Sequence, residues 1–475
     1  MTVEQTGLVA LVLYLGVLVV LTLIARRARM KTPSEFYLGG RALPLFVLFF
    51  TLYATTYSGN SLIGYPGEAY RRGFAWVMST GFMMAIMVVF LILAPRLRRA
   101  SVEHQLVTPG DYLRVRYRSG ALVILIGVVQ VVALTNYLLA QLIAMGHVAA
   151  GLTGDKIPYA YGVVGLALVI LAYETLGGLR AVAFTDALQG ILLLVGLSVM
   201  LLWLAGRSGG MEGVTAWVLA NEPARAVVPS AAECRNWASS LLLLGIGSVV
   251  YPQTIQRIYA AKTTKTLYQS LALMAWMPLV TVFVVTLVGI AALPILSGLG
   301  EIGADEVLPR VIRAWSAHGG IAVILATLVF IGALAAIMST ADSVLLSLGS
   351  IISEDVLGGD RHDPATTRRG KWVGAVLLLV MVGVALYPRI TLWHLIELKM
   401  EILMQCAPAF LLGVHWRRLR AGPVLLGVVA GCAVALWGMA SGTARFAGVH
   451  MGVIGLGLNF AIVTAGGLAG RRPAS

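Results

Sequence analysis

Long apolar runs separated by short polar segments make up most of the chain. Thirteen of these runs reach about 20 residues, the length that a helix needs to cross the hydrocarbon core of a bilayer. The eleventh run fits least well, because Glu397, Lys399 and Glu401 lie in its first half. The pattern predicts an all-α polytopic membrane protein with about 13 transmembrane helices. The runs begin near Gly7, Ala42, Ala75, Gly120, Pro158, Ala181, Trp237, Ala272, Ile321, Lys371, Ile390, Gly422 and His450.

Composition excludes an ordinary soluble domain. Hydrophobic residues make up 59% of the 475 residues and charged residues 12%, with a mean hydropathy of +0.88. The three cysteines, Cys234, Cys406 and Cys432, are too few and too scattered for a disulfide framework or a metal cluster. The first run ends in Arg26-Arg27 without a small-residue cleavage site, so we expect a retained helix rather than a signal peptide.

The basic residues predict an orientation. A net charge of +14 could suggest nucleic acid, but Lys and Arg occur in short clusters between apolar runs, as they do in membrane-protein loops. If alternate loops face opposite sides, one side collects most of the 35 Lys and Arg residues, Arg257, Lys262 and Lys265 among them. By the positive-inside rule that side is cytoplasmic. We therefore expect a multi-pass protein of the cell (inner/plasma) membrane, with its N-terminus outside and its C-terminus cytoplasmic, and no nucleic-acid partner.

Two runs are interrupted at their middle. Within the second run, residues 52–61 turn polar, and the seventh run carries Gly245, Gly247 and Pro252 in the segment 245–253. Polar or non-helical backbone persists at membrane depth only where it packs in protein or lines a wet cavity. Glycine and proline are also simply common in membrane helices. However, two interrupted runs five spans apart and oppositely oriented are typical of inverted-repeat transporters, whose site lies at the repeat interface.

The ninth run adds a polar stripe. Ser339, Ser343 and Ser347 recur every four residues and share one helix face. Hydroxyls and unwound-backbone carbonyls are hard oxygen ligands that suit a small cation such as sodium. These hydroxyls could instead bond their own helix or a neighbouring one. That alternative does not account for Asp342, because a carboxylate within a span is costly and usually marks an ion or substrate path.

The chain carries a set of motifs at 36–41, 58–59, 64–67, 177–182, 185–186, 189, 252–253, 256–257 and 338–343. Together they resemble those of the sodium:solute symporter family, which contains bacterial proline, sugar and sialic-acid symporters and sodium/glucose transporters. The resemblance covers about residues 36–355 and implies a leucine-transporter-like core of two inverted five-helix repeats. It would make residues 1–475 one transporter domain, with an extra helix at 7–26, repeats at 42–206 and 237–415, and two C-terminal helices at 422–470.

The resemblance also implies ion sites. It would place a co-transported sodium ion among backbone carbonyls and hydroxyls of the second and ninth runs: Ala54, Tyr57, Ala336, Ser339 and Thr340. Asp186 matches an acidic residue linked in relatives to cation exit, although an acid is also favoured in a first helical turn by the helix dipole. A second cation would recruit Asp186, Asp342 and Ser343. Thr56 stands where proline-transporting relatives have a carboxylate, so ion coordination or cargo is expected to differ from theirs. Glu174 replaces a small or hydroxylated residue usual in the family, and it is either an additional proton or cation group or a solvated carboxylate near a span end.

The solute should face the same cavity from the second, third, fourth and seventh runs. No arginine within a span stands out as the partner of a carboxylate, although positive helix ends at the breaks could serve. Buried amides also often act only as contacts between helices. The candidate residues are Ser58, Asn60, Ser61, Ser79, Gln130, Tyr137, Gln141, Tyr251 and Gln253.

The expected function is sodium-coupled symport of a small polar organic solute into the cytoplasm by alternating access, by a protein that works as a monomer and is not an enzyme. Two alternatives remain at this point. A proton-coupled carrier of the same fold would use Asp186, Asp342 or Glu174 as its coupling group. A transporter-like sensor would bind the solute without net flux.

Overall fold

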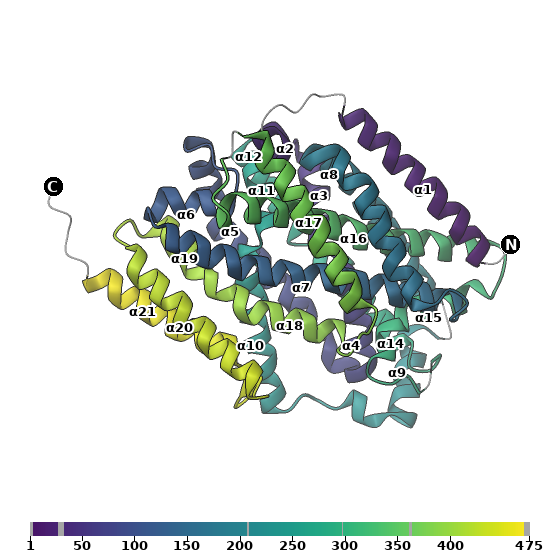
Figure 1. Cartoon of the computed structure of the whole chain (residues 1–475). Helices are drawn as coiled ribbons and strands as arrows, with labels where there is room; N and C mark the ends of the chain where they lie inside the picture. Colours follow the sequence, from purple (N-terminus) through teal and green to yellow (C-terminus); the bar gives the residue numbers. More distant parts are fainter. Residues whose placement is uncertain (1–2, 27–32, 207–208, 297, 361–362, 470–475) are drawn as a thin grey trace.

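The computed structural model describes residues 3–26, 33–206, 209–296, 298–360 and 363–469. Within them, the side chains at 3, 4, 22, 25, 26, 33, 34, 172–178, 180, 181, 205 and 364, which include Glu174, are outside the described part. The described chain is almost entirely helical, with one short antiparallel pair, β1 (Arg445–Phe446) and β2 (Val449–His450). Helices distant in sequence pack side by side in a single bundle (Figure 1).

Every predicted apolar run is mostly helical. Two adjacent runs, the fifth and the sixth, share one helical stretch, and the eighth and eleventh are divided into shorter helices. The elements that carry the runs are α1 (Val3–Arg26), α3 (Leu45–Thr56), α5 (Thr80–Glu103), α7 (Gly120–Thr153), α8 (Tyr159–Gly206), α10 (Ala231–Gly247), α12 (Thr264–Met274), α13 (Met277–Val280), α14 (Val282–Ala291), α16 (Ile321–Ser350), α17 (Pro364–Ala385), α18 (Leu392–Leu403), α19 (Ala407–His415), α20 (Ala421–Ala440) and α21 (Met451–Ala469).

Shorter helices connect these elements: α2 (Pro33–Leu38), α4 (Tyr65–Arg72), α6 (Pro109–Tyr117), α9 (Gly210–Asn221), α11 (Pro252–Ala260) and α15 (Val307–Ser316). By length and composition alone, seven helices in the described part could cross a membrane, or eight if the bent pair α10 and α11 is one span. The all-α membrane class is therefore confirmed.

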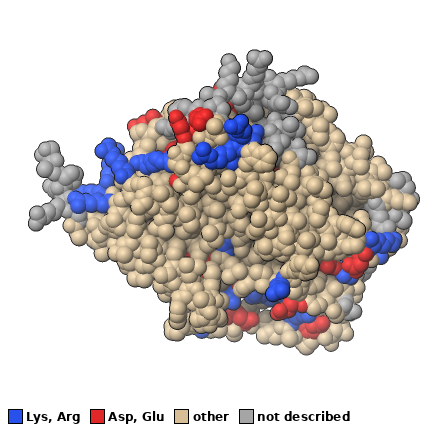
Figure 2. Space-filling model, viewed as in Figure 1, with Lys and Arg blue, Asp and Glu red and all other residues tan. Residues whose placement is uncertain are grey.

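The surface is that of a protein embedded in lipid. Large apolar side chains such as Leu13, Ile92, Leu168 and Leu202 are exposed on the outer helices. Figure 2 shows a broad uncharged belt, with the Lys, Arg, Asp and Glu side chains of this face gathered above and below it. An apolar surface this large would be unfavourable in water and is stable against acyl chains.

Both predicted interruptions are confirmed. α3 ends at Thr56, Tyr57 takes an extended conformation, and a π-helical turn, η2 (Asn60–Gly64), leads into α4. The seventh run breaks in the same way: α10 gives way to a short 3₁₀ turn, η5 (Ser248–Val250), Tyr251 is extended, and α11 begins at Pro252. The segments Ala231–Val250 and Pro252–Ala260 on either side of this break meet at an angle of 54°. Each break puts polar backbone inside the bundle.

The charged eleventh run is accommodated by the last part of the chain. Glu397 of α18 accepts a hydrogen bond from Arg445 at 2.5 Å, and Glu401 pairs with His450 at 2.8 Å. Arg445 and His450 lie on the β1–β2 hairpin that joins α20 to α21. A carboxylate in a span is tolerated when it is paired, so the hairpin makes these two acids possible.

Candidate functional site

The break after α3 lies against the middle of α7 and α16. At Gly59 the backbone N–H donates to the side-chain oxygen of Gln141 on α7 at 2.9 Å instead of continuing the helix. A Cβ at Gly59 would come within 2.8 Å of the Ala144 Cβ and 3.0 Å of Ile337. Only glycine fits this close approach, so the sequence Ser58-Gly59 fixes where the chain can unwind.

The predicted sodium ligands lie on these facing elements. The backbone positions Ala54 and Ala336 and the hydroxyl residues Ser339 and Thr340 are fully buried, and Tyr57 stands at the break. The Thr340 hydroxyl lies close to Tyr137 but makes no hydrogen bond of normal geometry within the described part of the chain. A buried hydroxyl without a regular partner costs about 1–3 kcal/mol, and coordination of an ion would remove that cost.

A second buried cluster surrounds Asp186 of α8. Its carboxylate accepts hydrogen bonds from Ser339 at 2.6 Å, Arg257 at 2.8 Å and Thr51 at 2.5 Å. The Arg257 guanidinium also donates to Ser343 at 2.6 Å. Asp186 and Ser343, both predicted for a second cation, are thus brought together around a guanidinium group.

The sequence assigned Arg257 to the positive charges of a loop, and the structure corrects this. Arg257 is 1% exposed and lies on α11. A buried guanidinium is stable only with a carboxylate and further acceptors, and Asp186 with its neighbouring hydroxyls supplies them. The carboxylate oxygens of Asp342, in contrast, are buried and have no hydrogen-bond partner among the described residues, and no bond joins Asp342 to the Asp186 cluster.

The rest of the serine stripe connects helices. Ser347 donates to the side-chain oxygen of Gln256 at 2.7 Å, and the Gln256 amide donates to Ser350 at 2.9 Å. These contacts fasten α16 to α11. For Ser347 and Ser350 the simpler interpretation, contacts between helices, is the one that the structure supports.

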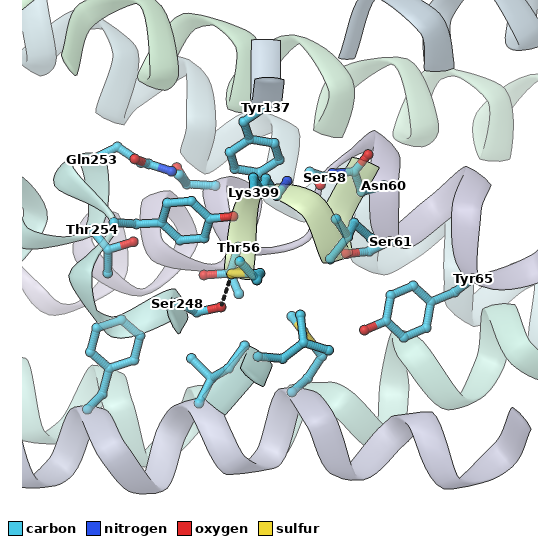
Figure 3. A pocket seen from close by; sticks show the side chains of 18 residues that line it. Thr56, Ser58, Asn60, Ser61, Tyr65, Tyr137, Ser248, Gln253, Thr254 and Lys399 are labelled. Atoms are coloured by element: carbon cyan, nitrogen blue, oxygen red, sulfur yellow. Dashed lines mark hydrogen bonds between the residues drawn. The ribbon is translucent and has the colours of Figure 1, made fainter. Parts of the chain in front are cut away.

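A pocket lies beside the α3 break, between the two interrupted helices. Figure 3 shows side chains from both broken helices pointing into it, with Ser58, Asn60 and Ser61 on one side and Gln253 and Thr254 on the other. Tyr137 and Tyr251 stack at a centroid distance of 5.3 Å. The 18 lining residues are Thr55, Thr56, Ser58, Asn60, Ser61, Tyr65, Met83, Ile86, Phe90, Tyr137, Leu244, Ser248, Tyr251, Gln253, Thr254, Ile396, Lys399 and Met400.

Six of the nine predicted solute residues line this pocket: Ser58, Asn60, Ser61, Tyr137, Tyr251 and Gln253. Ser79, Gln130 and Gln141 do not. Ser79 lines a separate cavity, Gln130 donates to the backbone oxygen of Val250 at 3.1 Å, and Gln141 holds the break at Gly59. The two glutamines therefore hydrogen-bond to the backbone at the two breaks, Gln130 at the seventh-run break and Gln141 at the α3 break.

Sequence reasoning missed several lining residues. Thr55 and Thr254 were adjacent to predicted positions, and Ser248 lay within the predicted break at 245–253, so proximity to each break was the available signal. Lys399 was noted only as a charge that weakened the eleventh span. A lysine inside an otherwise apolar run was the signal that could have located it.

An aromatic cluster separates the pocket from a second cavity. The Trp393 ring lies 4.7 Å from that of Trp76, 5.5 Å from Tyr65 and 5.9 Å from Phe82, measured between centroids. Tyr65 lines the inner pocket, whereas Trp76, Phe82 and Trp393 line the second cavity near the start of α10. Opening the pocket in this direction would require these rings to separate.

The chain matches the family model of the sodium:solute symporter family over residues 36–431. It belongs to that family. The sodium/pantothenate symporter of Escherichia coli (strain K12) is 27% identical over 442 residues, which cover 89% of this chain and 88% of the relative. The sodium/glucose cotransporter of Vibrio parahaemolyticus is 26% identical, covering 87% of this chain and 80% of the relative.

A solved structure shows the same fold. The substrate-bound outward-open state of a Na⁺-coupled sialic acid symporter aligns with a TM-score of 0.78 over 100% of this chain and 99% of that one, at 18% identity. The family and the relatives are transporters rather than enzymes, and as a sodium:solute symporter the chain carries sodium together with a solute.

Proposed function

We propose that this symporter brings a small polar organic solute into the cytoplasm with sodium, by alternating access around the α3 break. The observation that carries the proposal is the break itself. In this segment, the backbone faces the α16 hydroxyls. The side chains that follow it line the pocket. One short segment therefore meets both cargoes.

The ion would bind between α3 and α16. We assign its ligands to the carbonyls of Ala54, Tyr57 and Ala336 and the hydroxyls of Ser339 and Thr340. Thr55 and Ser343, whose hydroxyl oxygens are 3.4 Å apart, connect the same two helices next to this position. An ion that binds across the two helices stabilises the arrangement in which both are in place.

The solute would bind next to the ion. Ser58, Asn60 and Ser61 follow Tyr57 directly, so ordering this segment for sodium also orders the wall of the pocket. Sodium then raises the affinity for the solute, and by linkage the solute raises the affinity for sodium to the same degree. That reciprocal coupling lets the sodium gradient drive uptake.

After both have bound, the ion would leave past Asp186. This carboxylate lies one hydrogen bond from Ser339 and is also bound to Arg257. The Arg257 guanidinium already occupies this position, because it donates to both Asp186 and Ser343. We therefore assign Asp186 to the exit path for one sodium ion and not to a second sodium site. Relatives are named for pantothenate and for glucose, and this chain's own cargo would be of similar size.

The architecture that we propose has thirteen spans and two inverted five-helix repeats at 42–206 and 237–415, with helices at 7–26 and 422–470 outside this core. The N-terminus would be outside and the C-terminus cytoplasmic, in a protein that acts as a monomer in the cell membrane. The matching breaks in α3 and in α10–α11 support the repeat. Labelling of a tag at each terminus from either side of the membrane checks the orientation.

A thermal-shift screen tests the proposal before the cargo is known. Purified protein is heated with small polar solutes in sodium or in potassium. We expect sodium alone to raise the melting temperature and one class of solute to raise it further only in sodium. Equal shifts in sodium and in potassium would contradict the ion site.

A further inference from the structure

Lys399 is the one charged residue among the 18 that line the pocket. It is 2% exposed, and within the described part of the chain no Asp or Glu lies within ion-pair distance of it. Figure 3 shows it below Tyr137, between Gln253 on one side and Ser58 and Asn60 on the other. A buried ammonium without an anionic partner is costly, so its place in the pocket calls for an explanation.

The geometry of α18 separates Lys399 from the two acids on the same helix. Residues two apart in an α-helix differ by about 200° around its axis. Glu397 and Glu401 point toward the C-terminal hairpin, where Arg445 and His450 bind them. Lys399 points the other way, into the pocket.

The aromatic contacts of Lys399 stabilise it only in part. Its ammonium lies 3.4 Å from the ring centroid of Tyr137 and 5.9 Å from that of Tyr251. A cation–π contact contributes about 0.5–2 kcal/mol, whereas an ion loses several kcal/mol on burial. An ammonium also has three N–H donors, and a carboxylate accepts from them more strongly than a ring face does.

Other groups in the pocket are also unpaired. The amide nitrogen and oxygen of Asn60, the side-chain oxygen of Gln253 and the hydroxyl of Tyr251 are buried without hydrogen-bond partners among the described residues. The pocket thus offers one positive charge together with neutral donors and acceptors, and its lining contains no carboxylate.

We propose that Lys399 binds the solute and that the solute carries a carboxylate group, which pairs with the Lys399 ammonium. The polar remainder of the solute then meets Asn60 and Gln253. Binding would satisfy the buried cation, and because Lys399 and Trp393 lie on the same short helix, the solute would hold α18 and its aromatic cluster against the pocket. This inference rests on the proposed symport and narrows its cargo to organic anions.

The test uses pairs of probes that differ at the carboxylate. Pantothenate with pantothenol, lactate with lactamide, sialic acid with its methyl ester, and glucose as a neutral sugar are compared by thermal shift in sodium. We expect at least one carboxylate to stabilise the wild-type protein at a concentration where its neutral partner does not. If no carboxylate does so, or if neutral partners act equally well, the proposal is wrong.

Variants assign the effect to the residue. Lys399→Met should weaken carboxylate binding about 30-fold or more, the usual effect of removing one member of a buried charge pair, and Lys399→Arg should retain part of it. Lys371→Met is the matched control, because Lys371 lies over the Phe36 ring at 4.7 Å but outside the pocket. Unchanged carboxylate preference in Lys399→Met would overturn the proposal.

Thermal stabilisation by sodium alone distinguishes the proposed sodium site from the assignment of Lys399 to the solute carboxylate. Lys399→Met should keep the wild-type stabilisation by sodium, which also shows that the variant is folded. If sodium fails to stabilise the wild-type protein, the proposed ion site is wrong. If sodium stabilises both proteins but carboxylates show no preference for the wild type, only the assignment of Lys399 is wrong.

Discussion

Thr340 gives the sharpest residue-level test of the ion site. Its hydroxyl makes no regular hydrogen bond within the described chain, so its removal breaks no such bond there. Thr340→Val should weaken sodium binding by about tenfold or more, since a hydrogen-bonding group that serves a charge contributes about 1.5–3 kcal/mol. Thr340→Ser, which keeps the oxygen, should bind sodium nearly as the wild type does.

The measurement is the sodium concentration that gives half of the thermal stabilisation. Ser347→Ala is a suitable control on the same helix, because Ser347 binds Gln256 and is not assigned to the ion. Equal sodium affinity in Thr340→Val and in the wild type would remove Thr340 from the site.

The Asp186–Arg257 pair predicts a stability effect of a different kind. Arg257→Gln leaves a buried carboxylate without its cation, which costs about 3–5 kcal/mol. The double variant Asp186→Asn, Arg257→Gln removes both charges and should unfold at a higher temperature than Arg257→Gln alone. If the two single losses simply add in the double variant, the residues are not coupled and the ion pair contributes little.

At this scale, sequence reasoning located residues but not their partners. The polar runs identified Ser58, Asn60 and Gln253 because polar groups inside apolar spans are conspicuous. Arg257 was missed as a site residue, because a charge near the end of a span resembles a loop charge until packing places it. Lys399 was noted only as a charge within the eleventh run, because its sequence position alone does not show which neighbour it faces. Burial and pairing depend on contacts between distant segments, which spacing within one helix does not specify.

At the scale of elements, the α3 break is the feature that organises the site. Gly59→Ala adds a Cβ that meets Ala144, Gln141 and Ile337 at 2.8–3.0 Å. The break would have to move away from α7, and both the carbonyls assigned to sodium and the side chains assigned to the solute would move with it. We expect Gly59→Ala to lower the affinities for sodium and for the solute together.

Gly16→Ala is the matched control, because nothing lies within 4 Å of the added Cβ. Circular dichroism should show both variants to be helical, and thermal shifts with sodium report the ion site. Normal sodium and solute binding in Gly59→Ala would show that the break does not determine the geometry of the site.

Both breaks were predictable from sequence, since glycine, proline and polar residues clustered where apolar residues were expected. The supporting roles of Gln130 and Gln141 were not, because a buried amide can face a pocket or a backbone group equally well. The division of the eighth and eleventh runs into short helices was also missed. Hydropathy records how apolar a segment is and not where its helical hydrogen bonds stop.

At the scale of the molecule, the apolar belt, the family match and the shared fold describe a sodium:solute symporter. The sequence predicted this class because membrane spans and family motifs are local signals. It did not reveal the pairing of α18 with the C-terminal hairpin, which joins residues about 50 positions apart. That contact allows a helix with two acids and a lysine to lie beside the pocket.

The most direct test of the account is solute uptake by proteoliposomes with and without an inward sodium gradient. A labelled solute identified by the thermal-shift screen should accumulate only with the gradient, and accumulation should persist with a proton ionophore and fall strongly in Thr340→Val. Accumulation that is the same in potassium and is abolished by the ionophore would contradict sodium coupling.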